Sequence, residues 1–158
     1  MRKVISNTTP ILSLLKIDRL NILKELYGTI IIPNAVYEEV EAGKGWLYYA
    51  NLKEYSWIQI EKVKSNLSDL LFDLDKGEAE VILLAKEMSA DLVIMDEELG
   101  RKYAKLAGLT MTGTLGLLLK AKEQKLIENI KPLLFELRQK GVWISPQIIN
   151  KITSITNE

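Results

Sequence analysis

Short apolar runs alternate with helical patterns along most of the chain. Val4-Ile5, Thr29–Ile32 and Leu92–Met95 are unbroken runs of apolar or β-branched residues, which are typical of strands covered on both faces. Residues with helical periodicity follow each run and are also clear over Leu74–Met88. This alternation predicts an α/β fold with three α/β/α layers and a mainly parallel, roughly five-stranded sheet.

Residues that favour turns and helix ends set the expected boundaries. Thr9 is a good N-cap, and Pro10 after it suits the first position of a helix. Gly28 is expected to end the next helix, and Pro33-Asn34 to open another. The aromatic patch over Trp46–Leu52 is expected to lie on a short helix.

Length and charge restrict the organisation of the protein. At 158 residues we expect a single domain over residues 1–158, with a C-terminal helical region, 128–158, packed on it. Basic and acidic residues number 21 each, so the net charge is zero and any contact with nucleic acid needs a local basic patch. No apolar run is long enough to cross a bilayer and no signal-peptide pattern is present, so we expect no membrane association.

Histidine and cysteine are both absent from the chain. Their absence excludes disulfides, thiolate zinc sites, Ser-His and Cys-His catalysis and imidazole metal sites. The remaining chemistry belongs to carboxylates, hydroxyls, amides, Lys, Arg and Tyr. Among metals, such oxygen ligands suit hard cations such as Mg²⁺ or Mn²⁺.

Four oxygen-bearing side chains are expected at one edge of the sheet. Asn7 follows the first strand and Asp96 the fourth, and ligands of parallel sheets bind outside the carboxyl ends of the strands, where the strand order reverses. On helical wheels, Glu39 and Glu78 each lie about 60° from a core-facing valine. We therefore expect these four side chains to converge, although each has an ordinary structural alternative.

Five segments carry a resemblance to a known family. Together they span about residues 4 to 127, and they resemble the PIN domain, a fold whose best-known members are metal-dependent ribonucleases. The chain is similar to a bacterial and archaeal branch of predicted nucleic-acid-binding proteins. Each segment alone is a weak signal, whereas the set in this order is specific. The segments are VISNTTPILSLLKI, IIIPNAVYEEV, LDKGEAEVILLAKE, LVIMDEELGRKYAKLAGL and TGTLGLLLKAKEQKLI.

The resemblance implies a metal site. Position by position, the family's four acidic sites fall on Asn7, Glu39, Glu78 and Asp96. It implies that these four residues hold one or two Mg²⁺ or Mn²⁺ ions, and that the three acids are catalytic. In a nuclease of this kind the metals activate water for in-line attack on a phosphodiester and stabilise the departing oxygen.

The resemblance also implies a substrate and partners. Thr8, Thr9 and Thr114 match small hydroxyl residues that border the site, and Arg101 is placed to touch phosphate. We expect these four residues to bind substrate. The implied function is a divalent-metal-dependent endoribonuclease that hydrolyses RNA phosphodiesters. By resemblance it is the toxin of a toxin–antitoxin pair, silenced by a small antitoxin protein, cytoplasmic and homodimeric.

Asn7 departs from the family pattern, because most active PIN nucleases have aspartate there. An amide oxygen can ligate a hard cation, but it brings no charge and cannot act as a base. The alternative function is therefore a catalytically weak or inactive PIN-like module that binds nucleic acid or a partner. A third hypothesis is a different metal-dependent phosphotransfer or phosphatase domain.

Each candidate also has a purely structural interpretation. Asn7 and Asp96 could cap the helices that follow them, and Glu78 could be a first-turn acid favoured by the helix dipole. Glu39 could pair with a cation, and Arg101 could lie on a solvated helix face. The aromatic residues Trp46, Tyr48 and Tyr49 are assigned to packing or an interface, because we expect no basic cluster to adjoin them. The acids expected at the surface are Glu80, Glu87, Glu97 and Glu98.

Overall fold

A five-stranded parallel sheet forms the centre of the protein, as the apolar runs predicted. The computed structural model describes residues 2–66 and 73–158. The strands follow the order β3-β2-β1-β4-β5, and every neighbouring pair is parallel. The strands are β1 (Val4–Ser6), β2 (Ile30–Pro33), β3 (Ile58–Glu61), β4 (Leu92–Ile94) and β5 (Met111–Thr112).

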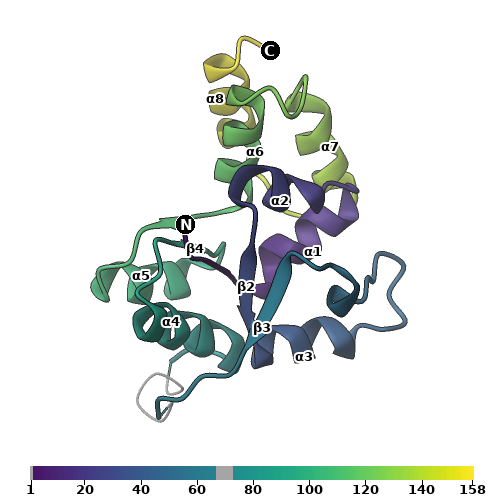
Figure 1. The fold of residues 1–158 in the computed structure, drawn as a ribbon. Helices are drawn as coiled ribbons and strands as arrows, with labels where there is room; N and C mark the ends of the chain where they lie inside the picture. The colour runs from purple at the N-terminus through teal and green to yellow at the C-terminus, as the bar shows by residue number, and fades with distance from the viewer. Residues whose placement is uncertain (1, 67–72) are drawn as a thin grey trace.

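Helices cover both faces of this sheet, which gives the predicted three-layer α/β/α architecture. Helix α4 packs on β1, β2 and β4 with α3 and α5 beside it, while α2 and α6 lie on the other side (Figure 1). The helices are α1 (Thr8–Lys16), α2 (Asn21–Tyr27), α3 (Asn34–Ala42), α4 (Lys76–Met88), α5 (Glu98–Leu106), α6 (Thr114–Glu123), α7 (Lys131–Gln139) and α8 (Pro146–Ile155), with a short 3-10 helix, η1 (Leu52–Glu54).

The strand order reverses between β1 and β4. Strands β2 and β3 extend the sheet on one side of β1, and β4 and β5 extend it on the other. Ile5 pairs with Ile31 on one side and with Val93 on the other, so β1 is fully enclosed. Side chains that follow β1 and β4 therefore emerge together at the switch point, where ligands of parallel sheets bind.

One predicted helix start and one predicted helix are wrong. Helix α1 begins at Thr8 with Asn7 in the N-cap position, so Thr9 lies inside the helix. The segment Trp46–Leu52 is not a helix, because its backbone bonds are those of successive turns: Trp46 N–H donates to Gly43, and Tyr49 N–H to Trp46. The side chain of Asn51 then accepts from Lys53 N–H and starts η1.

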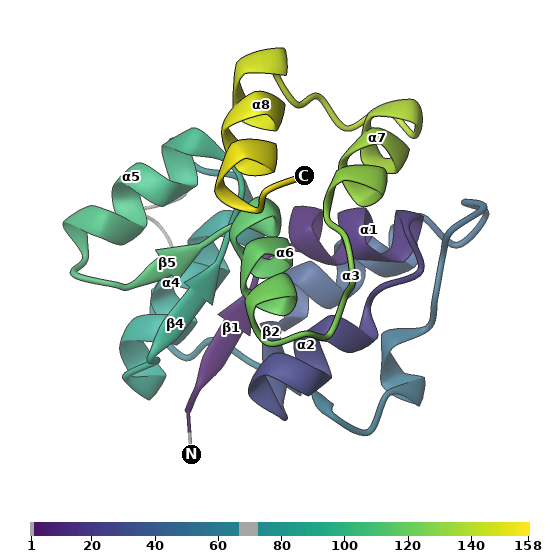
Figure 2. The ribbon, with the colours of Figure 1, turned by 90° about the horizontal axis from the view of Figure 1, so that it is seen from above.

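The C-terminal helices share the apolar core with the sheet layers. Leu134, Leu137 and Ile152 belong to the same buried cluster as the strand residues. Figure 2 shows α7 and α8 beside α6 and α1, at the end of the molecule where β1 and β4 point. Among the described residues, no helix is both long enough and apolar enough to span a membrane.

Candidate functional site

Asn7 lies at the centre of the switch point. It is only 4% exposed, and its backbone N–H donates to the Ile94 carbonyl at 2.9 Å, which fixes it between β1 and β4. Although it occupies the N-cap position of α1, its side chain makes no capping hydrogen bond. Instead, Asn7 Nδ2 donates to Glu97 Oε2 at 3.3 Å. The interpretation of Asn7 as only a helix cap is therefore wrong.

Glu97 is a site residue that the sequence did not reveal. It was expected at the surface, but it is half-buried and accepts hydrogen bonds from the Asn7 amide and the Thr9 hydroxyl. It stands in the N-cap position of α5 without capping that helix. Its partners lie some ninety residues away in the chain, so the local sequence pattern could not predict its position in the site. Glu97 brings a negative charge next to the neutral Asn7.

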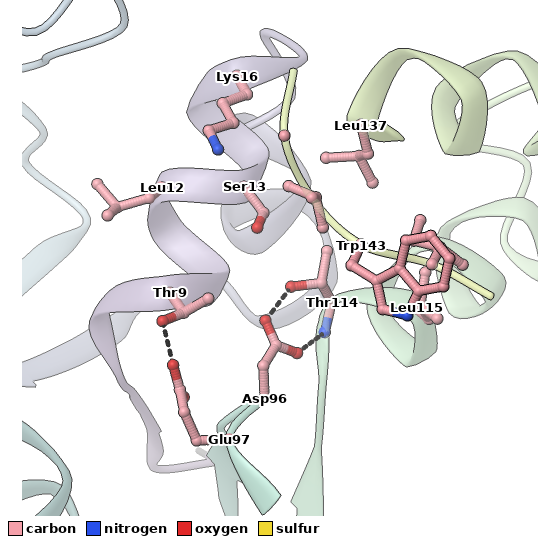
Figure 3. Close-up of a pocket in the computed structure, with 13 residues that line it drawn as sticks. Thr9, Leu12, Ser13, Lys16, Asp96, Glu97, Thr114, Leu115, Leu137 and Trp143 are labelled. Carbon is pink, nitrogen blue, oxygen red and sulfur yellow. Dashed lines mark hydrogen bonds between the residues drawn. The ribbon is translucent and has the colours of Figure 1, made fainter. Parts of the chain in front are cut away.

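Asp96 ties the end of β4 to the start of α6. Its Oδ1 accepts from Thr114 N–H at 2.7 Å, and its Oδ2 accepts from the Thr114 hydroxyl at 2.6 Å (Figure 3). It does not cap α5, as the structural interpretation proposed; it holds the positive end of α6 instead. A Cβ atom at Gly113 would lie 2.7 Å from Asp96 Oδ1, so only glycine allows this approach.

Gly77 marks the point where Glu39 and Asn7 meet. A Cβ atom at Gly77 would lie 2.8 Å from Glu39 Oε1 and 3.5 Å from Asn7 Oδ1. These oxygens come from α3 and from the end of β1, and Gly77 is in the first turn of α4. Within residues 2–66 and 73–158, Glu39 forms no ion pair with a basic side chain, so the cation-paired alternative does not hold. Three segments thus bring two oxygen donors to one point.

Glu78 is the most perturbed acid of the site. It is 7% exposed, and its pKa is raised to about 7, first because burial removes solvent from the carboxylate. A hydrogen bond with Asp75 raises the pKa further, as does repulsion from the charges of Asp75, Glu97 and Glu39. Asp75 also caps α4 by accepting from Glu78 N–H at 2.8 Å. The helix dipole alone therefore does not explain Glu78, which lies within a crowd of carboxylates.

Thr8 and Arg101 have different surroundings. The Thr8 hydroxyl is buried and has no hydrogen-bond partner within the described part of the chain, so it is available to a ligand. Arg101 is half-buried and its Nη1 donates to the Met95 carbonyl at 3.0 Å. Arg101 therefore braces the end of β4 and does not extend from a solvated helix face.

Glu80 also departs from the prediction of a surface acid. It is buried, and its Oε1 accepts from Ala35 N–H at 3.0 Å, at the start of α3. The helical wheel placed it away from the sheet, but α3 covers that side of α4 and supplies a backbone donor. Glu80 is thus a structural acid, whereas Glu87 and Glu98 are exposed as expected.

The donor set consists of oxygen atoms only, which suits a hard divalent cation. A nearby positive charge would also compensate the buried Glu78 carboxylate, whose pKa is raised. Across residues 2–66 and 73–158, however, no three acidic side chains lie close enough together to hold a metal ion. Each of the four acids has its own contact: Glu39 approaches the Asn7 oxygen, Glu97 accepts from the Asn7 amide, Glu78 lies beside Asp75, and Asp96 accepts from Thr114.

A pocket of about 480 Å³ opens beside Asp96 and Glu97. Its walls come from α1, from the start of α6 and from the loop between α7 and α8, which carries Trp143 (Figure 3). Farther along, Lys16 and Lys140 lie over the rings of Trp46 and Tyr48. The expectation that no basic cluster adjoins these aromatic residues is wrong, because the fold brings the lysines from distant segments.

Comparison with known proteins identifies the family. A family model for the PIN domain matches residues 3–158. Among solved structures, the chain is similar to a domain of a functionally unknown protein from Methanocaldococcus jannaschii DSM 2661, with 21% identity and a TM-score of 0.46. That match covers 72% of this chain and 91% of the other. No curated protein matches the chain.

Proposed function

Because the chain belongs to the PIN domain family, a nuclease-like fold that generally uses divalent metals, we propose that it is a metal-dependent endoribonuclease. It would hydrolyse RNA phosphodiesters. The observation that carries this proposal is the gathering of Asn7, Glu39, Glu78, Asp96 and Glu97 around the β1–β4 switch point. Asn7, Asp96 and Glu97 follow strand ends, Glu78 lies in the first turn of α4, and Glu39 lies within α3.

The proposed metal ligands are the Asn7 amide oxygen and the carboxylates of Glu39, Glu78 and Asp96. When bound, Mg²⁺ or Mn²⁺ supplies the positive charge that activates water and stabilises the departing oxygen. The fit rests on the all-oxygen donor set, on the raised pKa of Glu78 and on the unpartnered Thr8 hydroxyl. Since no three described acids are already within reach of one ion, we expect side-chain rotation on binding.

The side chains around the proposed metal site have distinct roles in this proposal. Glu97 supplies a negative charge beside Asn7, so the site keeps four acids despite the neutral amide. By donating through Nδ2 to Glu97, Asn7 keeps Oδ1 on the side of Glu39. A carboxylate held at the metal, such as Glu78, would be placed to accept a proton from the attacking water. Thr114 and Arg101 fix the end of β4.

The biological setting is a further part of the proposal. We propose that the protein is the toxin of a toxin–antitoxin pair and a homodimer. Leu106, Ile148 and Ile155 are large apolar side chains exposed to solvent, and an antitoxin or a second copy would cover such side chains. Sedimentation of the purified chain, alone and with the product of a neighbouring short open reading frame, tests both statements.

Cleavage of a mixed-sequence single-stranded RNA in Mn²⁺ tests the nuclease proposal. Asp96→Asn keeps the shape of the side chain and should lower the cleavage rate about 100-fold or more. The matched control is Asp91→Asn, because Asp91 lies at the opposite end of β4 and binds Lys3 N–H at 2.6 Å. Equal cleavage by wild type and Asp96→Asn would contradict the site. Tight RNA binding without cleavage would favour the non-catalytic alternative.

A further inference from the structure

We propose that the pocket beside Asp96 holds one nucleotide of a single-stranded RNA, with its base stacked on Trp143. The inference rests on the proposed function, because it takes the acidic end of the pocket as the point of cleavage. It adds a substrate-binding residue outside the acidic site. The pocket volume of about 480 Å³ falls within the range of small-molecule sites, and a single nucleotide is of that class.

The pocket has two chemically different ends. Asp96, Glu97 and Thr114 form one end, where the proposed metal site lies. Lys16 lies on the wall formed by α1, and Trp143 projects from the opposite wall (Figure 3). A nucleotide has the same division, since its phosphate would bind the metal ions that the acidic end is proposed to hold and its base requires an apolar face. The arrangement orients a nucleotide with its phosphate toward the acids and its base toward the indole.

Trp143 is an exposed ring on an anchored backbone. The residue is 78% exposed, whereas Ile144 next to it is 3% exposed. Val142 N–H donates to the Leu137 carbonyl at 2.9 Å, which fixes the loop on the other side of Trp143. The indole is therefore held at the rim of the pocket while its faces remain open to solvent. An aromatic face presented in this way stacks on any base, independent of its identity.

A strip of alternating cations and aromatic rings continues from the pocket. Lys16 Nζ lies 5.9 Å from the Trp46 ring centroid, and Lys140 Nζ lies 5.1 Å from that of Tyr48. The two rings are 5.1 Å apart, and Lys140 Nζ donates to the Lys16 carbonyl at 2.7 Å. These four residues therefore form one continuous surface that begins at the pocket wall. Alternating rings and cations are the features by which proteins bind single strands without sequence preference.

The strand must be single, because a duplex hides the faces of its bases in the stack. A protein segment is the other possible occupant of this surface. The metal ions that the acids would hold and the lysines beyond the pocket favour a polyanion whose backbone follows these cations, although Lys140 is also paired with Glu136 at 2.7 Å.

Binding of a short single-stranded RNA to the full chain tests the inference. The measurement uses Ca²⁺ in place of Mn²⁺, and the RNA is checked for integrity afterwards. We expect Trp143→Ala to weaken binding about 5- to 150-fold, the range found when a stacking ring is removed. Trp143→Phe should retain most of the affinity. The matched control is Phe135→Ala, because Phe135 is an exposed ring on α7 that does not line this pocket.

Tryptophan fluorescence gives a readout that a structural role would not change. Bound RNA should quench the wild-type emission, and the part of this quenching that comes from Trp143 should disappear in Trp143→Phe. Trp46 in the strip should still be quenched, whereas Trp57 is nearly buried and should contribute little. Unchanged RNA affinity in Trp143→Ala would overturn the inference. If this variant still cleaved RNA in Mn²⁺, the proposed function would stand. Equally tight binding of duplex RNA would also overturn it. So would a changed sedimentation coefficient in Trp143→Ala without loss of RNA affinity, which would assign Trp143 to a protein interface. Absence of both RNA binding and cleavage in wild type would reject the inference and the proposed function together.

Discussion

Glu78 and Glu158 are both shielded acids near the start of a helix, yet their pKa values move in opposite directions. The pKa of Glu78 is raised to about 7 by burial, by the hydrogen bond with Asp75 and by neighbouring carboxylates. Burial also acts to raise the pKa of Glu158, but hydrogen bonds from Lys122, Ile130 and Lys131 outweigh it and lower the pKa to about 2.

The difference lies in the partners that each carboxylate finds. Glu158 pairs with Lys122 at 2.7 Å and accepts the first backbone N–H groups of α7, so its charge is fully compensated. In the first turn of α4, by contrast, Asp75 accepts the Glu78 N–H, and the Glu78 carboxylate lies near other acids. A compensated acid contributes to folding, whereas a crowded acid costs stability unless a cation binds. This contrast supports a metal site at Glu78.

The largest expected effect is on catalysis. Glu78→Gln should lower Mn²⁺-dependent RNA cleavage about 100- to 10,000-fold, because the amide can neither accept a proton nor carry the charge that holds a metal. Glu158→Gln makes the same chemical change at the compensated position and should leave the cleavage rate within about twofold of wild type. Initial rates at saturating RNA measure both. Similar losses of cleavage rate in the two variants would contradict a catalytic role that is specific to Glu78.

The next prediction separates the metal site from the fold. Gly77→Ala places a Cβ atom 2.8 Å from Glu39 Oε1, so the flexible end of Glu39 must move away from Asn7. We expect Mn²⁺ affinity to fall about 10- to 100-fold, as is typical when ligand orientation is disturbed, while the melting temperature is kept or raised. Calorimetric titration with Mn²⁺ measures the affinity. Gly45→Ala is the matched control, because a Cβ atom there meets nothing within 4 Å.

Glu158 should contribute stability that acid removes. Its pKa in the folded protein is about 2, below the ordinary value of 4.5, so its contribution is present above pH 4.5 and is lost as the pH falls toward 2. Glu158→Gln should reduce the free energy of unfolding by about 1–2 kcal/mol at pH 7, and the difference from wild type should shrink below pH 4.5. Urea denaturation at pH 7, 4.5 and 3 checks the sign. If the difference in unfolding free energy were the same at all three pH values, the loss of stability would not come from the loss of the Glu158 charge.

Glu78→Gln should have the opposite effect on the metal-free protein. The folded pKa of Glu78 is raised to about 7, so its charge destabilises the fold fully above pH 7 and ceases to do so as the pH falls toward 4.5. We expect the variant to be more stable than wild type by on the order of 1 kcal/mol at pH 8 in EDTA. Thermal unfolding at pH 8 and pH 5 measures the difference. If the variant were less stable than wild type at pH 8, the Glu78 charge would not destabilise the fold, and the prediction would be wrong.

Much of the fold followed from the sequence because burial leaves a direct pattern. Strands β1, β2 and β4 are enclosed on both faces, so their residues form unbroken apolar runs. The positions of Asn7 and Asp96 were predictable for the same reason, since each comes at or just after the end of such a run. Glu39 and Glu78 followed from helical periodicity, which places them beside the core-facing stripe of their helices.

The errors about the site concern partners that are distant in the chain. Glu97 looked like an ordinary surface acid until the fold placed it against Asn7 and Thr9. Glu80 was assigned to water, yet α3 presents the Ala35 N–H to it. Local periodicity shows which side of a helix is apolar, but it cannot show that a second helix will offer a hydrogen-bond donor to the other side.

Mn²⁺ binding, measured by the loss of the free-ion electron paramagnetic resonance signal, tests the central claim most directly. The claim is that the crowded acids at the β1–β4 switch point form the metal site, whereas the compensated acid at α7 does not. We predict saturable binding to wild type and Glu158→Gln, and binding to Glu78→Gln that is weakened at least tenfold. Equal binding by all three proteins, or no binding to wild type, would contradict the claim.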